Sequence, residues 1–114
     1  MAGYFRVPML AAQAVAGASS SPELLGAYLA LRRYSYGPER NLTAAGAQAI
    51  RKATGCSDWR SKRLLEELMR VRALGGRQVV LPTHERKKNA AVYCLDAFEG
   101  DDAYLPTLMP DHML

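Results

Sequence analysis

The chain has 114 residues, 49% of them hydrophobic, and a formal net charge of +4. A chain of this length folds as one domain and buries about two thirds of its unfolded-chain surface, so it needs neither disulfides nor a metal to fold. Cys56 and Cys94 are too far apart for a CxxC pair, and His84 and His112 offer no ligand spacing to go with them. We therefore expect no metal, no cofactor and a cytoplasmic location.

The positive charge is concentrated in one section of the chain. Between Arg51 and Lys88, eleven Lys and Arg stand against four Asp and Glu, a net charge of +7, which leaves −3 for the remainder. Residues after Lys88 include five Asp and Glu and no Lys or Arg. A basic section of this kind is typical of a nucleic-acid footprint, whereas the acidic end is repelled by phosphate.

The N-terminal stretch favours a short strand over a targeting segment. Residues 7–18 are apolar and end in AVAGASS, which resembles a cleavage region, but Arg6 is the only positive charge before them and Pro8 interrupts the run. We expect instead an extended piece, Tyr4 to Val7, that is ended by Pro8 and adds an edge strand to a small sheet. No stretch approaches the roughly 20 continuous apolar residues of a membrane span, so we expect no membrane association.

A first core helix is predicted after Ser21-Pro22-Glu23. Serine caps helices, proline is tolerated at the first helical position, and a glutamate favours the positive helix end. The helix is expected to stop by Gly37-Pro38 and to pack across two later helices in a three-helix core. Its apolar face is formed by Leu24, Leu25, Tyr28, Leu29 and Leu31.

Two further helical patterns are separated by only Gly55-Cys56-Ser57, which predicts a helix-turn-helix. The first helix is expected from Thr43, as its N-cap, to Thr54, and Gly55 can close it in a left-handed conformation. The second helix is expected over about 57–74, with Ser57 as its N-cap. Its buried stripe consists of Leu64, Leu65, Leu68 and Val71, and its opposite face carries Trp59, Arg60, Lys62, Arg63, Arg70 and, in part, Arg72.

A β-hairpin is predicted directly after this helix. Gly75-Gly76 breaks the helix, and RQVVLP reads as a strand that Pro82 limits at one end. A polar, basic loop from Thr83 to Asn89 separates it from a second strand in AAVYCLDAF.

The stretches YFRVP, SPELLGAYLALRRYSYG and LTAAGAQAIRKATGCSDWRSKRLLEEL, followed by the basic hairpin, resemble the winged helix-turn-helix domains of many bacterial, phage and plasmid DNA-binding proteins, including replication initiators. The resemblance implies an α+β fold with a three-helix core followed by a β-hairpin wing. We expect this domain to cover residues 1–98, and residues 99–114 to form an acidic C-terminal tail or the start of a further segment.

The resemblance also implies a DNA-binding surface. The helix that begins at Ser57 would be the recognition helix, which approaches the major groove or its rim, and the wing would reach neighbouring phosphates or the minor groove. The residues expected to contact DNA are Thr43, Ser57, Trp59, Arg60, Lys62, Arg63, Arg77, Arg86, Lys87 and Lys88.

Two functional classes remain, because no residue pattern predicts an enzyme: neither histidine has the context of a catalytic base, and there is no GxxxxGK phosphate loop. The first class is a duplex DNA-binding protein that acts in transcriptional regulation, or in replication or segregation of a phage-like or plasmid-like element. The second is a winged helix used as a protein-interaction module, whose surface around Trp59, Tyr34 and Tyr36 binds a partner. The sequence leaves open whether the protein forms a homodimer.

Overall fold

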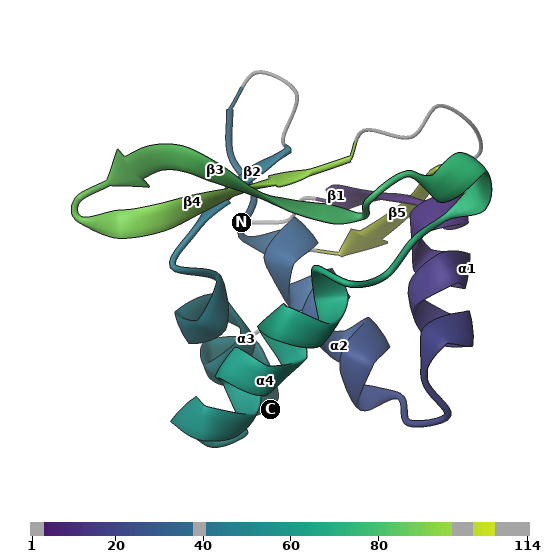
Figure 1. Cartoon of the computed structure of the whole chain (residues 1–114), viewed down its shortest axis with the longest axis horizontal. Helices are drawn as coiled ribbons and strands as arrows, with labels where there is room; N and C mark the ends of the chain where they lie inside the picture. The colour runs from purple at the N-terminus through teal and green to yellow at the C-terminus, as the bar shows by residue number, and fades with distance from the viewer. Residues whose placement is uncertain (1–3, 38–40, 97–101, 107–114) are drawn as a thin grey trace.

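The computed structural model describes residues 4–37, 41–96 and 102–106. Within these ranges the chain is an α+β fold with four α-helices, a three-stranded antiparallel sheet and a separate two-stranded sheet (Figure 1), which confirms the predicted class. The elements in chain order are β1 (Tyr4–Pro8), α1 (Met9–Ala18), α2 (Glu23–Arg33), β2 (Leu42–Ala44), α3 (Gly46–Thr54), α4 (Asp58–Leu68), a 3-10 turn (Leu74–Gly76), β3 (Val80–Lys87), β4 (Ala90–Leu95) and β5 (Asp102–Pro106).

The N-terminal strand is present, and it is followed directly by a helix that was not predicted. β1 pairs antiparallel with β5, so that Arg6 lies opposite Tyr104 (Figure 1). α1 then begins after Pro8, whose φ of −64° and extended ψ turn the chain into the helix. Its Ala, Leu and Gln are good helix formers, and Ala11 and Val15, four residues apart, are fully buried. The apolar run thus forms a packed helix that covers one side of α2.

The core is built around α2. Ala27, Tyr28 and Leu31 are fully buried, and α2 contacts α1, α3 and α4. The three helices that we expected to pack together do so, and α1 adds a fourth to the same core. Ile50 of α3, the leucines of α4 and the valines of the sheet complete it.

A buried cation lies at the C-terminal end of α2. Arg32 is 1% exposed, and its Nε donates to the hydroxyl of Tyr28 at 2.9 Å while Nη2 donates to the backbone carbonyl of Asp96 at 2.5 Å. Burial raises the pKa of Tyr28 above its ordinary value. These bonds connect α2 to the end of β4 and satisfy polar groups that would be costly to bury unpaired.

Both helices of the predicted helix-turn-helix are present, joined by a short turn, but the first helix starts later than predicted. Thr43 is fully buried in β2, where it lies opposite Tyr93 of β4, and the helix begins at Gly46. The prediction of a Thr43 cap was wrong because the segment is extended and bonded to β4; Ala45, with φ +52°, makes the change from strand to helix. A Cβ at Gly46 would lie 3.2 Å from both methyl carbons of Leu65, so the close approach of α3 to α4 favours glycine here.

The second helix starts where predicted and ends earlier than predicted. Gly55 adopts the expected left-handed conformation with φ +73°, and Ser57 Oγ accepts the N–H of Arg60 at 3.1 Å as the N-cap. α4 ends at Leu68 and not at residue 74, because the chain turns there and Gln78 donates to the carbonyl of Met69 at 3.0 Å. The buried stripe holds Leu64, Leu65 and Leu68 as predicted, and Val71 is buried beyond the helix end.

The hairpin is longer and its turn tighter than predicted. β3 continues to Lys87, so the expected loop from Thr83 to Asn89 is wrong. Only Lys88 and Asn89 form the turn, with φ values of +50° and +68°, which is the geometry of a two-residue hairpin turn. The strand order is β2-β4-β3, so β3 is an edge strand. Proline has no backbone N–H to donate, and an edge strand tolerates Pro82 where a central strand would not.

Candidate nucleic-acid interface

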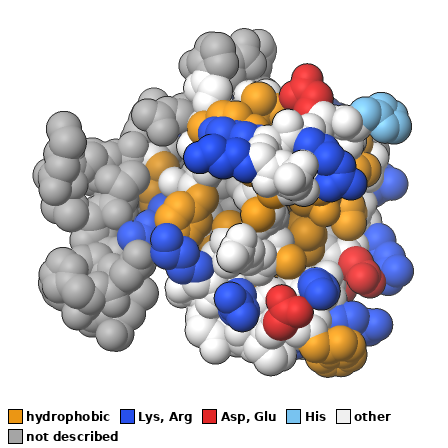
Figure 2. Space-filling model, turned by 90° about the vertical axis from the view of Figure 1, so that its left-hand side faces the viewer, with side chains coloured by type: hydrophobic (Ala, Val, Ile, Leu, Met, Phe, Trp, Pro, Cys, Tyr) orange, Lys and Arg blue, Asp and Glu red, His pale blue; other side chains and the backbone are white. Residues whose placement is uncertain are grey.

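α3, α4 and β4 of the β3–β4 hairpin line a groove on one side of the molecule. Most of its lining residues are apolar, and its polar lining residues come from α3 and α4. Figure 2 looks onto this side and shows Lys and Arg side chains both on the hairpin above and on the helices below, with hydrophobic side chains between them. We call this side the α4–hairpin face; the groove is lined by Ala45, Gly46, Ala47, Gln48, Asp58, Lys62, Leu65, Glu66, Met69, Ala90, Ala91 and Tyr93.

The first turns of α4 present three of the predicted DNA-binding side chains to solvent. Trp59 is 67% exposed, and the Arg63 guanidinium lies 5.5 Å from the centre of its ring. Lys62 is exposed and forms an ion pair with Asp58, one turn earlier, at 3.1 Å. Because Asp58 is paired in this way, its negative charge is partly compensated where a phosphate would approach.

Arg60, which was expected to contact DNA, binds a carboxylate of the protein itself. Its Nε and Nη2 donate to the two carboxylate oxygens of Glu23 at 3.1 and 3.0 Å. The hydrogen bonds from Arg60 hold the pKa of Glu23 below its ordinary value. Arg60 therefore links the first turn of α4 to the first residue of α2.

Ser61, next to Arg60, shows how a polar residue is accommodated on the buried side of α4. It is fully buried, and its hydroxyl donates to the carbonyl of Ser57 at 2.9 Å. The Sγ of Cys56 lies 3.1 Å from the same hydroxyl, so the half-buried thiol takes part in this packing. The turn between the two helices is thus held by short polar contacts.

The three cations at the end of the hairpin are exposed and are held in different ways. Arg86 donates to the carbonyl of Asn89 at 3.1 Å across the turn. The ammonium of Lys87 lies 3.9 Å from the centre of the Tyr36 ring. Lys88 occupies the turn itself. The hairpin end therefore presents a cluster of positive charge without burying any of it.

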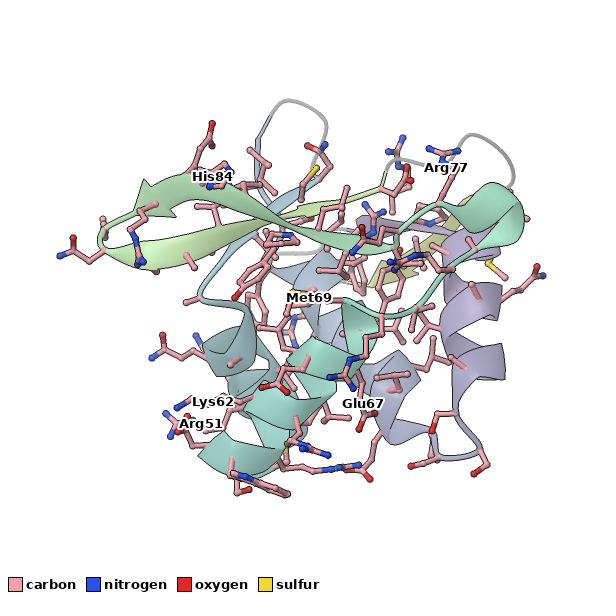
Figure 3. The ribbon with its side chains drawn as sticks, in the orientation of Figure 1. Arg51, Lys62, Glu67, Met69, Arg77 and His84 are labelled. Carbon is pink, nitrogen blue, oxygen red and sulfur yellow. The ribbon has the colours of Figure 1, made fainter. Side chains whose placement is uncertain are left out.

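Two of the predicted contact residues do not belong to the α4–hairpin face. Thr43 is fully buried in β2, so its hydroxyl is inaccessible to DNA. Arg77 makes a bidentate ion pair with Asp96, in which Nε donates to Oδ2 at 2.9 Å. Figure 3 shows Arg77 at the opposite end of the sheet from the hairpin turn, well away from Lys62.

The sequence prediction missed exposed residues of α3. Arg51 and Lys62 project toward the same side of the molecule (Figure 3). Gln48, Arg51 and Lys52 also line a depression beside the groove, and the two hollows share Ala45 and Gln48. The spacing of these three residues, i, i+3 and i+4, places them on one helical face, and this signal was already present in the predicted helix from Thr43 to Thr54.

No helix in the described parts of the chain is long and apolar enough to cross a membrane. Comparison of the chain with protein-family models, curated proteins and solved structures finds no significant match.

Proposed function

We propose that the chain is a winged helix-turn-helix protein that binds duplex DNA. In this proposal α4 enters the major groove and the β3–β4 hairpin lies along the neighbouring backbone as the wing. The observation that carries the proposal is that α4, through Asp58 and Lys62, and β4, through Ala90 and Ala91, line the same groove, and that Ala90 directly follows the basic end of the hairpin. The element order, α2, α3 and α4 followed by a basic hairpin, also supports it.

The dimensions of α4 fit this role. Eleven residues give a helix of about 16 Å at roughly 1.5 Å per residue, and the major groove of B-DNA, about 12 Å wide, admits one helix. The N-terminal turn of α4 carries the exposed Trp59, Lys62 and Arg63, and the positive end of a helix favours phosphate. The Arg60–Glu23 pair holds this turn in place, so little ordering is needed on binding.

The distribution of cations supports a footprint that is wider than α4 alone. α3 contributes Arg51 and Lys52, and the hairpin contributes Arg86, Lys87 and Lys88, all of them exposed. Contacts of this kind position a protein on DNA without reading its sequence. Sequence discrimination would then fall to Arg63 and its neighbours on α4. We propose the cytoplasm as the location, and transcriptional regulation or replication and segregation of a mobile element as the process.

A protein-interaction module is the second candidate, and one observation favours it. The groove lining is mainly apolar, and its α4 residues include Asp58 and Glu66 beside Lys62, so α4 gives the groove no excess of positive charge. A mainly apolar lining with mixed charges suits a peptide segment better than a phosphate backbone.

A salt titration separates the two candidates. With about five phosphate contacts, the logarithm of the affinity for a random duplex should fall with a slope of about −4 to −5 against the logarithm of the salt concentration, because bound cations release counterions. Fluorescence anisotropy of a labelled duplex gives this slope. A slope near zero, or no binding to any duplex at low salt, would contradict the DNA proposal and direct attention to the groove as a partner site.

A further inference from the structure

The chain has one tryptophan, and it is unusually exposed for such a large apolar side chain. Trp59 is 67% exposed in the first turn of α4. Aromatic side chains contribute most when they are buried, so a ring left in water is a candidate contact for a ligand. The ring is free of a packing role in the core and is open to solvent over most of its surface.

The surroundings of Trp59 indicate what kind of ligand it fits. Among the described residues, the other large exposed apolar side chains are Met9, Leu10 and Leu81, which belong to α1 and β3 and not to α4. Trp59 is thus a single flat ring among polar and charged neighbours in sequence, Ser57, Asp58, Arg60, Lys62 and Arg63. A protein partner usually covers a central group of apolar anchors, which this site lacks, whereas a nucleobase needs one flat surface and nearby cations.

The Arg63 side chain adds a second feature of a base-stacking site. Trp59 and Arg63 are four residues apart, so they share one face of α4, and the guanidinium lies 5.5 Å from the ring centre. Because the guanidinium lies over one face of the ring, a base would stack on the other face, and the guanidinium could bind the phosphate attached to that base. The pair also stands on a rigid support, because Ser57 caps the helix and Arg60 is bonded to Glu23.

We infer that Trp59 and Arg63 form a stacking site for an unpaired nucleobase, and that the protein therefore binds locally unpaired DNA more tightly than fully paired duplex. The inference rests on the proposed DNA-binding function and specifies the form of DNA that the α4–hairpin face prefers. In an intact duplex both faces of each base are covered by its neighbours, so a base must leave the stack before it can reach Trp59. In a bubble or at a fork this step has already taken place.

The test compares two DNAs of the same length, a fully paired duplex of about 20 base pairs and the same duplex with a short central mismatch bubble. Stacking on an aromatic side chain changes affinity by about 5- to 150-fold per base, so the wild-type protein should prefer the bubble within that range. Binding should also quench the fluorescence of Trp59, which is the only tryptophan and reports on the site directly. Trp59→Ala should lose much more affinity for the bubble than for the paired duplex and so lose the preference, and Trp59→Phe should keep part of it.

Matched controls separate this site from general effects. Leu10→Ala, which removes an exposed apolar side chain from α1, should leave both affinities unchanged. Circular dichroism confirms that each variant is folded. Equal wild-type affinity for bubble and duplex would overturn the inference while the proposed function stands, and so would an equal loss on both DNAs in Trp59→Ala, which would make Trp59 an ordinary groove contact. Failure to bind either DNA would overturn the proposed function together with the inference.

Discussion

Removing the three cations at the end of the hairpin, by Arg86→Gln, Lys87→Gln and Lys88→Asn together, will lower the affinity for any duplex by about 8- to 500-fold at 0.1 M salt. The range corresponds to one to three lost phosphate contacts. Each contact contributes a salt slope of roughly −0.9, so it raises the affinity about 8-fold at 0.1 M salt relative to 1 M salt, and the variant loses this gain. The loss should be the same for selected and random DNA, because phosphate contacts carry no sequence information.

The design of this variant keeps the hairpin intact. Lys88 has a φ of +50°, and asparagine tolerates that conformation well, so the two-residue turn is preserved. Glutamine retains part of the stem by which Lys87 covers the Tyr36 ring. Exposed substitutions of this kind usually change stability by less than about 0.5 kcal/mol each.

The matched charge control for the hairpin variant is Arg70→Gln with Arg72→Gln. Both side chains are exposed and line a depression beside α1, away from the α4–hairpin groove. This double variant also lowers the net charge of the protein, but it should alter the affinity only slightly. Anisotropy titrations at several salt concentrations measure both variants. An unchanged affinity and slope in the folded triple variant would show that the hairpin points away from DNA.

Replacing Arg32 by alanine will destabilise the fold by about 2–5 kcal/mol, the cost of a cavity in the core together with two buried polar groups that lose their partner. Those groups are the hydroxyl of Tyr28 and the carbonyl of Asp96, which Arg32 reaches at 2.9 and 2.5 Å. For a chain of this size the expected fall in melting temperature is about 8–20 °C.

The comparison variant for Arg32→Ala is Tyr28→Phe with Arg32→Met. It removes the cation and its hydroxyl partner together and keeps most of the volume, and apolar replacement of a buried polar pair is often close to neutral. The double variant should therefore be more stable than Arg32→Ala alone. Thermal and urea unfolding measure the difference. If Arg32→Ala had the same melting temperature as the wild type, the buried network would have no part in holding α2 to the end of β4.

Local signals were sufficient for the helices that carry the candidate site. Gly55 and Ser57 define the turn between α3 and α4 by their own backbone and capping preferences, and the leucine spacing of α4 identifies its buried side. Such features act within a few residues, so a sequence displays them directly.

The elements that the sequence did not reveal depend on contacts between distant segments. Thr43 resembles a helix cap, and only its pairing with Tyr93, fifty residues later, makes the segment a strand. β5 likewise exists through its pairing with β1 at the other end of the described chain. The polar residues of β3 were predicted as a loop because an exposed edge strand lacks the alternation of buried and exposed residues that identifies a strand.

For the predicted site, a sequence counts cations but does not show their partners within the protein. Arg60, Arg77 and Lys62 were all expected to contact DNA, and in the structure they form ion pairs with Glu23, Asp96 and Asp58. Glu23 and Asp96 are 37 and 19 residues away from the arginines that they bind. The proposed surface for DNA therefore combines Trp59, Lys62 and Arg63 on α4 with the hairpin end and the exposed side of α3.

The most direct test of DNA binding through the α4–hairpin face is an NMR titration of the ¹⁵N-labelled protein with a short duplex. The measured quantity is the change in chemical shift of each backbone amide. We expect the largest shifts in residues 57–63 of α4 and its cap, in residues 86–90 of the hairpin and in residues 48–52 of α3. The amide signals of α1 should not shift. Shifts concentrated in α1 and β1, with α4 and the hairpin unchanged, would contradict the proposed interface.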